Sequence, residues 1–408
     1  MTTLEWRALR AEDSAAWVDL SDAVEEVDKT GEHMGAEEFA EVMSDPDLVT
    51  VAGFDGDQMV ASGISWFKAG HVEVNSVLFE AGVRPSHRRR GIGRELLDRL
   101  TAVARSQHDQ RCPDLRFEPR STAHEANEGH AALLTGAGYE PVRYFFDMRV
   151  DLAIDRPDRA LPDGLTARTF EPADDEHLRV VHNACFAGHW GSIPSQPEYW
   201  HRHMTGNPSF RPEHTVLLFD QDDKIVAYVM GYASPAQEAG TGRKELWLGQ
   251  VGTVKPWRGK GVGTALLASV LTGAKVAGFD RAALAVDSGN ATGALGGLRA
   301  VRVQGHRPLD HVFAHPLGDP TQNSLPSGSA RTDHVRPGTL CSARTVAPRP
   351  TSRSTSACRS SVWKSRWARF LPERTSGTFC RPRYGASPGL APLGARNTNT
   401  PMMSVPIS

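Results

Sequence analysis

The chain has few cysteines and no cysteine framework. Its 408 residues include five, of which Cys112 and Cys185 stand far apart and the other three lie after residue 340. Neither the close spacing of a structural zinc site nor the dense pattern of a disulfide-stapled domain is present. We therefore expect no metal centre and a reducing, cytoplasmic location.

Long apolar runs are also missing. No stretch approaches the roughly 20 apolar residues that a membrane-spanning helix requires. Residues 1–6 lack the basic start and apolar core of a secretory signal. The sequence therefore predicts no association with a membrane.

Acidic residues are nearly absent from the last part of the chain. Residues 321–408 contain 13 Lys and Arg but only Asp333 and Glu373, whereas residues 1–320 contain 33 basic and 46 acidic residues. The net charge of −2 is thus the sum of −13 for residues 1–320 and +11 for residues 321–408. Residues 318–408, rich in Ser, Pro and Arg, are predicted to be disordered because they bury too little apolar surface to offset chain entropy. The acidic core argues against nucleic acid as a partner.

The chain does contain one sequence motif that occurs twice. Residues 83–97 and 254–267 each read Val-x-Pro, a basic turn with Arg-x-x-Gly-x-Gly, and then Leu-Leu. Each copy joins a β-like run to a helix with apolar residues at helical spacing. Glycine permits positive φ and the close approach of a ligand, and the N-terminus of a helix attracts anions. The repetition predicts two phosphate-binding turns.

The residue types exclude two common phosphate motifs. A P-loop needs Gly-Lys followed by Ser or Thr, but Lys260 precedes Gly261. A dinucleotide fingerprint needs a further glycine where Leu96 and Leu266 stand. The pattern instead resembles the acetyl-CoA pyrophosphate loop of the GNAT N-acetyltransferases. The alternative that the glycines only make a tight turn stays open at this point.

The remaining pattern repeats a similar order of elements in both halves. In the first half we predict strands at 6–10, 48–54, 58–67, 71–83 and 115–119, helices at 14–30, 90–105 and 126–135, and a closing strand pair within 139–152. In the second we predict strands at 165–170, 215–219, 224–232, 246–254 and 281–287, and helices at 174–186 and 261–277. This is an α/β chain with mixed α+β sheets, in which two tandem GNAT domains at 1–155 and 165–317 flank a linker at 156–164.

The resemblance implies acetyl-CoA as cosubstrate, held by its pyrophosphate in the turn and by its pantetheine arm along an opened strand. In the first half the implied contacts are Val83, Arg88, Arg89, Arg90, Gly91, Ile92 and Gly93. In the second half they are Val251, Gly252, Thr253, Val254, Arg258, Gly259, Lys260, Gly261, Val262, Gly263, Thr264 and Asn290.

Acetyl transfer also needs a base for the amine and an acid for the leaving thiolate. Glu245 is our candidate base, with Gln250, Asp287 or a bound water as alternatives. In the family a tyrosine usually serves as the acid, but Leu134 occupies that place in the first half and Leu298 in the second. We expect the first half to be a degenerate copy. We expect the second half to have evolved as the catalytic copy, although it lacks the tyrosine as written.

The second half changes character near Gly297. In a frame shifted by one nucleotide, the codons for residues 297–305 permit Val-Tyr-Glu-Arg-Cys-Gly-Phe-Arg-Val, the ending that the family would have there. We therefore predict that a frameshift near residue 297 truncates the second domain. The nucleotide sequence of this stretch decides the matter.

The acceptor is predicted to be a primary amine on a small molecule, bound by a monomer or homodimer. Residues 183–192, with Phe186, His189 and Trp190, would frame it. The same segment is similar to that of mycothiol synthases, whose chains also contain two GNAT domains. A catalytically impaired acetyl-CoA-binding scaffold is the non-enzymatic alternative.

Overall fold

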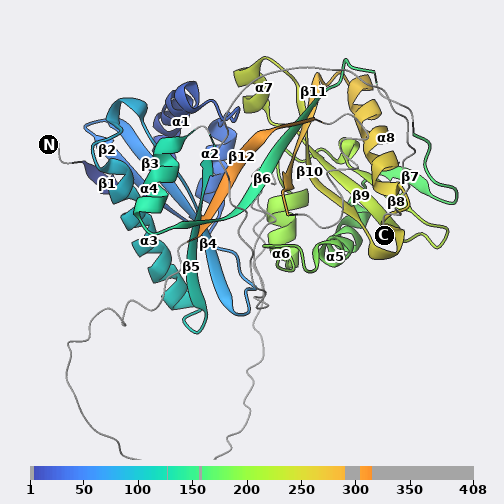
Figure 1. Ribbon diagram of the computed structural model, residues 1–408, viewed down its shortest axis with the longest axis horizontal. Helices are drawn as coiled ribbons and strands as arrows, with labels where there is room; N and C mark the ends of the chain where they lie inside the picture. The colour runs from blue at the N-terminus through green and yellow to red at the C-terminus, as the bar shows by residue number, and fades with distance from the viewer. Residues whose placement is uncertain (1–3, 126, 156–158, 290–303, 315–408) are drawn as a thin grey trace, which may run out of the picture. The chain divides into compact units, whose positions relative to one another are not determined.

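The computed structural model describes residues 4–125, 127–155, 159–289 and 304–314 (Figure 1). These residues form two compact units. Of the described residues, the first contains 4–125, 127–143, 206–208 and 310–314, and the second contains 144–155, 159–205, 209–289 and 304–309. The predicted disordered tail and residue 297, where the frameshift is predicted to begin, fall outside the described residues, whereas residues 304–314 of the stretch predicted to be out of frame are described.

The first unit is a sheet with helices on both faces. Trp17 of α1 and Phe39 of α2 pack with the side chains on one face, and Leu96 and Leu100 of α3 pack on the other. Its elements are β1 (Glu5–Arg7), α1 (Ser14–Asp28), α2 (Ala36–Ser44), β2 (Leu48–Asp55), β3 (Gln58–Trp66), β4 (Val74–Val83), α3 (Ile92–Arg111), β5 (Arg116–His124) and α4 (Glu128–Gly136).

The second unit repeats this arrangement. Its elements are β6 (Glu140–Asp151, which the boundary between the units divides), β7 (Thr166–Thr169), α5 (Asp175–Phe186), α6 (Pro197–Trp200), β8 (Val216–Phe219), β9 (Ile225–Tyr232), α7 (Pro235–Thr241), β10 (Glu245–Thr253), α8 (Val262–Val276), β11 (Arg281–Asp287) and β12 (Gln304–Ala314, also divided).

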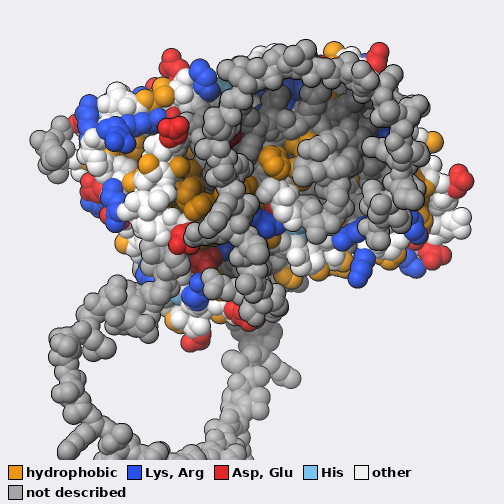
Figure 2. Space-filling view, in the orientation of Figure 1, with side chains coloured by type: hydrophobic (Ala, Val, Ile, Leu, Met, Phe, Trp, Pro, Cys, Tyr) orange, Lys and Arg blue, Asp and Glu red, His pale blue; other side chains and the backbone are white. Residues whose placement is uncertain are grey.

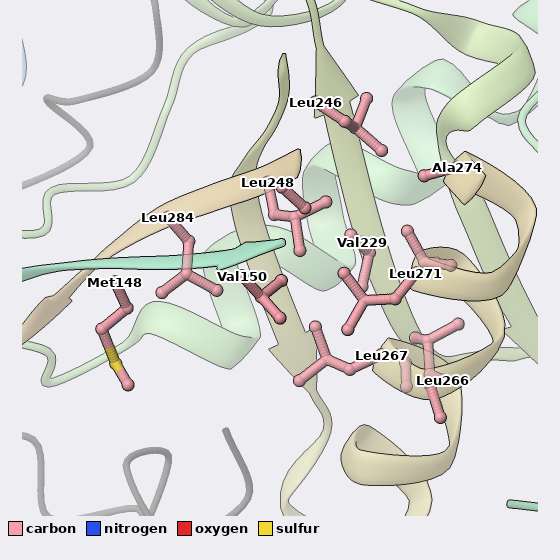
Figure 3. Packing of buried hydrophobic residues seen from close by; sticks show 14 of the residues in the cluster. Met148, Val150, Val229, Leu246, Leu248, Leu266, Leu267, Leu271, Ala274 and Leu284 are labelled. Carbon is pink, nitrogen blue, oxygen red and sulfur yellow. The ribbon is translucent and has the colours of Figure 1, made fainter. Parts of the chain in front are cut away.

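Figure 3 shows the largest core of the second unit. Leu266, Leu267 and Leu271 of α8 point toward the sheet, where buried side chains of four strands meet them. Those labelled in the figure are Val229, Leu246, Leu248, Leu284, Met148 and Val150. Burying an apolar side chain of this size stabilises a fold by about 1.5–3 kcal/mol. The apolar spacing that predicted this helix thus gives its buried face.

Each sheet contains one parallel pair of strands, and its other pairs are antiparallel. The order is β1-β2-β3-β4-β5-β12 in the first unit, where β4 and β5 are parallel. It is β6-β11-β10-β9-β8-β7 in the second, where β10 and β11 are parallel. The predicted mixed α/β fold in two tandem copies is confirmed.

The last strand of each sheet comes from the other half of the sequence. Residues 145–151 of β6 pair with β11 in the second unit, and residues 310–314 of β12 pair with β5 in the first. The prediction of a closing strand pair within 139–152 for the first half is therefore wrong. The strand is continuous, and its hydrogen bonds cover the edge that β11 would otherwise expose.

The duplication extends to a three-residue constellation at the start of each unit. Arg7 makes two 2.7 Å hydrogen bonds to Asp13 and lies 4.2 Å from the centre of the Phe54 ring. In the second unit Arg168 makes two 2.6 Å bonds to Asp174 and lies 4.2 Å from the Phe219 ring. Such bidentate pairs fix the geometry of both partners. The two units therefore share side-chain detail as well as strand order.

Replacing Met148 by alanine tests where β6 belongs. Met148 is 1% exposed and its Cα pairs with that of Leu284 in β11, so the change should lower the free energy of unfolding by about 2–5 kcal/mol. Hydrogen exchange should quicken in β11 and not in β4 or β5. Val142→Ala, at a 43% exposed position of the same strand, is the control. Faster exchange in β5 alone would contradict the strand exchange.

Candidate functional site

In the second unit, β10 runs into a sharp turn that opens α8. The 3₁₀ turn Lys255–Trp257 follows the strand, and Gly259 and Gly261 have φ of 74° and 77°. A Cβ atom at either glycine would meet no atom within 4 Å, so open space lies beside the turn. No side chain of the described residues caps α8. Its first N–H groups, at the positive end of the helix dipole, are therefore left for an external anion.

The first unit has the same turn between β4 and α3. Gly91 has φ of 85°, and no side chain of the described part of the chain caps α3. Arg89 stands where the second turn has Gly259, with φ of 62°. A non-glycine residue in this left-handed region costs about 1–2 kcal/mol. The first copy thus keeps the shape of the turn at some expense in stability.

The first arginine of each turn is held by the protein itself. Arg88 Nε donates to the Val83 carbonyl, and Arg258 Nε donates to the Thr253 carbonyl, both at 2.9 Å. Each guanidinium therefore ties the turn back to the strand that precedes it. The sequence predicted these arginines as cofactor contacts. In the structure their recorded bonds position the turn, and direct contact with a cofactor stays a prediction.

The strands that lead into the turns separate from their parallel neighbours. Parallel pairing of β4 with β5 ends at Phe79 and Ser121, although β4 continues to Val83. Pairing of β10 with β11 ends at Trp247 and Ala283, although both strands run further. Beyond these points β10 and β4 no longer pair with the parallel neighbour. An extended ligand arm could bond to main-chain groups released in this way, in the manner of an added strand.

Two glycines in β10 shape the opening of the second unit. The register between β10 and β9 shifts between Leu248 and Gln250, which makes Gly249 the site of a bulge. A bulge re-aims the strand that carries it. Gly252 lies against Tyr228, because a Cβ there would stand 2.3 Å from Cε1 of that ring. Both glycines lie beyond Trp247, on the part of β10 that no longer pairs with β11.

A carboxylate bridges the two strand ends in the first unit. Asp28, at the end of α1, accepts two bonds from Arg88 at 2.6 and 2.9 Å, and one from Asn127 Nδ2 at 2.8 Å. Arg88 follows β4 and Asn127 follows β5. The bridge therefore spans the side on which the two strands have parted.

The second unit lacks this carboxylate. Arg258 Nη2 donates instead to the main-chain oxygen of Cys185 near the end of α5, at 2.9 Å. Burial raises the pKa of the Cys185 thiol to about 11, so its side chain is uncharged at neutral pH. Asp28 and Cys185 each stand three residues before a glycine of positive φ, Gly31 and Gly188. They are equivalent positions at which the two copies differ.

The candidate base Glu245 lies at the closed end of the opening. It is 6% exposed, and its carboxylate is 2.7 Å from Arg281 Nε and 3.4 Å from Arg149 Nε. Glu245 and Thr253 stand eight residues apart, about 26 Å along an extended strand. Two guanidinium partners at this distance from the turn favour a structural role, and catalysis by Glu245 stays a prediction.

The other predicted contacts divide between the described and undescribed parts of the chain. Val251, Gly252 and Thr253 pair with β9 on one side of β10, and the Val254 N–H donates to Val226. Asn290 lies outside the described residues. Leu134, at the place where the family usually has a tyrosine acid, is fully buried. It is part of the core beneath α3.

An imidazole–carboxylate pair was not predicted as a pair. His189, in the loop after α5, has Nε2 3.8 Å from Oδ2 of Asp287, the last residue of β11. Trp190 beside it lies 6.3 Å from the Phe145 ring. The sequence offered each residue separately, as an acceptor contact or a base. Only the packing of the loop against the strand end joins them.

Figure 2 shows how charged side chains are distributed over one face of the molecule. Lys and Arg side chains alternate with Asp and Glu over the described part of the face in view, without the continuous basic stripe that follows a nucleic-acid backbone. Within the described residues, no helix is long and apolar enough to cross a membrane, and no group of three or more His, Cys, Asp or Glu could hold a metal ion.

Comparison with known proteins agrees with this geometry. The model of the acetyltransferase (GNAT) family matches residues 6–126 and again residues 176–294. The chain belongs to the GNAT acetyltransferase family. The predicted tandem arrangement is confirmed, and GNAT acetyltransferases in general use acetyl-CoA as cosubstrate.

Relatives of this GNAT chain include two mycothiol acetyltransferases. That of Paenarthrobacter aurescens is 27% identical over 216 residues, which is 53% of this chain and 63% of the relative. That of Tsukamurella paurometabola is 32% identical over 201 residues, 47% of this chain and 62% of the relative. The chain thus spans less than two thirds of either relative.

Two solved structures share the fold. A GCN5-related N-acetyltransferase from Sphaerobacter thermophilus has a TM-score of 0.60 at 23% identity, covering 76% of this chain and 95% of its own. A tandem GNAT protein from the clavulanic acid biosynthesis pathway has a TM-score of 0.58 at 16% identity, covering 78% and 100%.

Gly252→Ala tests the close approach inside the opening. A methyl group would overlap the fully buried Tyr228 ring, so the free energy of unfolding should fall by about 1–3 kcal/mol in urea titrations. Gly273→Ala is the matched control. It lies in α8 with nothing within 4 Å of the added Cβ, and should stabilise by up to about 1 kcal/mol. Equal effects of the two changes would contradict the packing described.

Proposed function

We propose that this chain is an acetyl-CoA-dependent N-acetyltransferase that acts on the primary amine of a small molecule, with catalysis in the second unit. The observation that supports this most is the geometry of β10. The strand leaves its parallel partner after Trp247, bulges at Gly249 and ends in an uncapped turn. These are the features needed to hold an extended arm and its diphosphate together.

The turn suits a diphosphate on physical grounds. Open space lies beside Gly259 and Gly261, and the N–H groups at the start of α8 lack a side-chain cap in the described structure. Lys260 adds positive charge, with its Nζ 5.1 Å from the Trp257 ring centre. We assign the diphosphate to residues 258–264, the arm to residues 251–254, and a contact with the arm to Asn290. Acetyl-CoA supplies the activated acetyl group as a thioester.

The two units differ where the arm would pass. In the first, Asp28 joins Arg88 to Asn127 across the parted strands and places a carboxylate beside the turn. That charge would repel a diphosphate and neutralises Arg88. In the second, Arg258 donates instead to the neutral main-chain carbonyl of Cys185. We therefore assign cofactor binding to the second unit, while the predicted contacts at Val83 and residues 88–93 would serve only a weaker site.

The acceptor side of the second unit supports a small amine. Phe186 ends α5, His189 and Trp190 follow it, and the Asp287 side chain is 2% exposed at the end of β11. Aromatic faces and a buried carboxylate attract ammonium groups. Because relatives are named mycothiol acetyltransferases, mycothiol lacking its acetyl group is the second candidate acceptor.

Calorimetry with acetyl-CoA and a thiol-release assay over a panel of small amines test the function. Binding followed by thiol release with one amine class supports an enzyme. Binding without release, for every amine including deacetylated mycothiol, supports a scaffold instead. Absence of binding contradicts both.

Matched glycine substitutions locate the working unit. Gly261→Val should weaken acetyl-CoA binding and lower the rate of thiol release at least tenfold, because valine disfavours φ of 77° and fills the cradle. Gly91→Val makes the same change at φ of 85° in the first unit and should leave the rate within about threefold. The opposite ranking would place catalysis in the first unit.

The carboxylate bridge gives a separate prediction for stoichiometry. The full chain should bind one acetyl-CoA by calorimetry, and Asp28→Ala should reveal a second, weaker site because the bridging charge is gone. Asp22→Ala, an exposed change in the same helix, is the control. Two equal sites in the unaltered chain would show that the bridge does not close the first unit.

A further inference from the structure

The tautomer of His189 is fixed by its own loop. Its Nδ1 lies 3.0 Å from the main-chain oxygen of Trp190. A carbonyl oxygen only accepts hydrogen bonds, so Nδ1 must carry the proton. In the neutral ring the lone pair is then on Nε2, which is the atom that can take up a second proton.

The protonatable nitrogen faces a buried anion. His189 Nε2 is 3.8 Å from Asp287 Oδ2, with side chains 19% and 2% exposed. The other carboxylate oxygen accepts the Gly289 N–H at 2.9 Å, which holds the carboxylate in place. Since both groups are largely removed from solvent, the anion stabilises an imidazolium more than it could in water.

The pair lies at the open end of the parted strands. Asp287 ends β11, well past Ala283, the last residue that pairs with β10. The His189 ring centre is 5.4 Å from that of Phe186, and the adjacent Cys185 carbonyl holds Arg258 at the start of the turn. The imidazole is thus placed between the cofactor turn and the end of β11, whereas Glu245 is at the closed end.

We propose that His189 is the general base of the acetyl transfer and that Asp287 stabilises its protonated form, an inference that rests on the proposed function. Nε2 takes a proton from the ammonium group of the acceptor, which frees the nitrogen lone pair. The nitrogen attacks the thioester carbonyl carbon, a C–N bond forms and the C–S bond breaks, with its electron pair leaving on sulfur. The second nitrogen proton passes to that thiolate, and the imidazolium returns its proton to solvent.

Cys185 and Arg258 are titratable or charged groups on the elements next to the pair. On α5 the Cys185 thiol stays protonated at neutral pH, and Arg258 of the turn is held by the carbonyls of Thr253 and Cys185. Neither can take a proton from an ammonium group. We expect the charge of Asp287, which faces Nε2 at 3.8 Å, to influence the pH response of His189.

Rates over a range of pH test the role. His189→Gln should lower kcat by about 10²–10⁴-fold and abolish the rise in rate with pH, since the lost base works only when unprotonated. The calorimetric Kd for acetyl-CoA should stay unchanged. Asp287→Asn should move the midpoint of that rise to lower pH, because the imidazolium loses its anionic partner. His177→Gln, exposed on α5, is the control and should leave both unchanged.

The outcomes distinguish failure of this inference from failure of the proposed function on which it rests. An unaltered chain that does not bind acetyl-CoA overturns both. If the unaltered chain turns over and the His189→Gln variant keeps the same kcat and the same rise of rate with pH, then His189 is not the base, while the proposed function stands. Nitrogen-15 NMR of the imidazole in the acetyl-CoA complex adds a readout independent of turnover. A ring protonated at Nε2 and not at Nδ1 would overturn the assignment whatever the rates show.

Discussion

The parting of two parallel strands is the constraint on which the candidate site depends. If β10 paired with β11 along its whole length, its main-chain N–H and C=O groups would be hydrogen-bonded to β11. No free edge would then remain to which an extended ligand could bond. Pairing instead stops at Trp247 and Ala283, and the strand carries on into the glycine turn. The edge, the turn and the uncapped start of α8 follow one another without a break. One backbone feature would thus supply the contacts that we propose for both the arm and the diphosphate.

The two copies show which parts of this device tolerate change. The Arg–Asp–Phe constellation near the start of each unit and the strand-tying arginine of each turn are the same in both. The residue that holds the turn arginine from the first helix of each unit differs, with Asp28 in one copy and Cys185 in the other. Structural anchors are retained in both units, while the charge that faces the opening is not. At this position the first unit has a carboxylate side chain, and the second has a main-chain carbonyl as the arginine's partner.

The exchanged strands link the stability of each sheet to the other half of the sequence. The β11 edge is covered by residues 145–151, and the β5 edge by residues 310–314. Neither half of the sequence holds all the strands of its sheet, so each unit is completed only by the full chain. This also explains why periodicity could locate β6 but could not assign its partner. The hydrophobic alternation of a strand is the same whichever edge it covers.

Local chemistry determined much of this protein. Glycine spacing predicted the turns at Gly91 and Gly261, because positive φ leaves few other choices, and apolar spacing predicted α3 and α8. The family, the mixed sheets and the tandem arrangement followed. The short helices α2 and α7 were not predicted, because each has too few turns to show a clear helical period of apolar residues. Tertiary structure alone decided the strand exchange, the Asp28 bridge, the two-arginine grip on Glu245 and the meeting of His189 with Asp287. Each joins residues distant in the sequence, and no local pattern encodes such a distance.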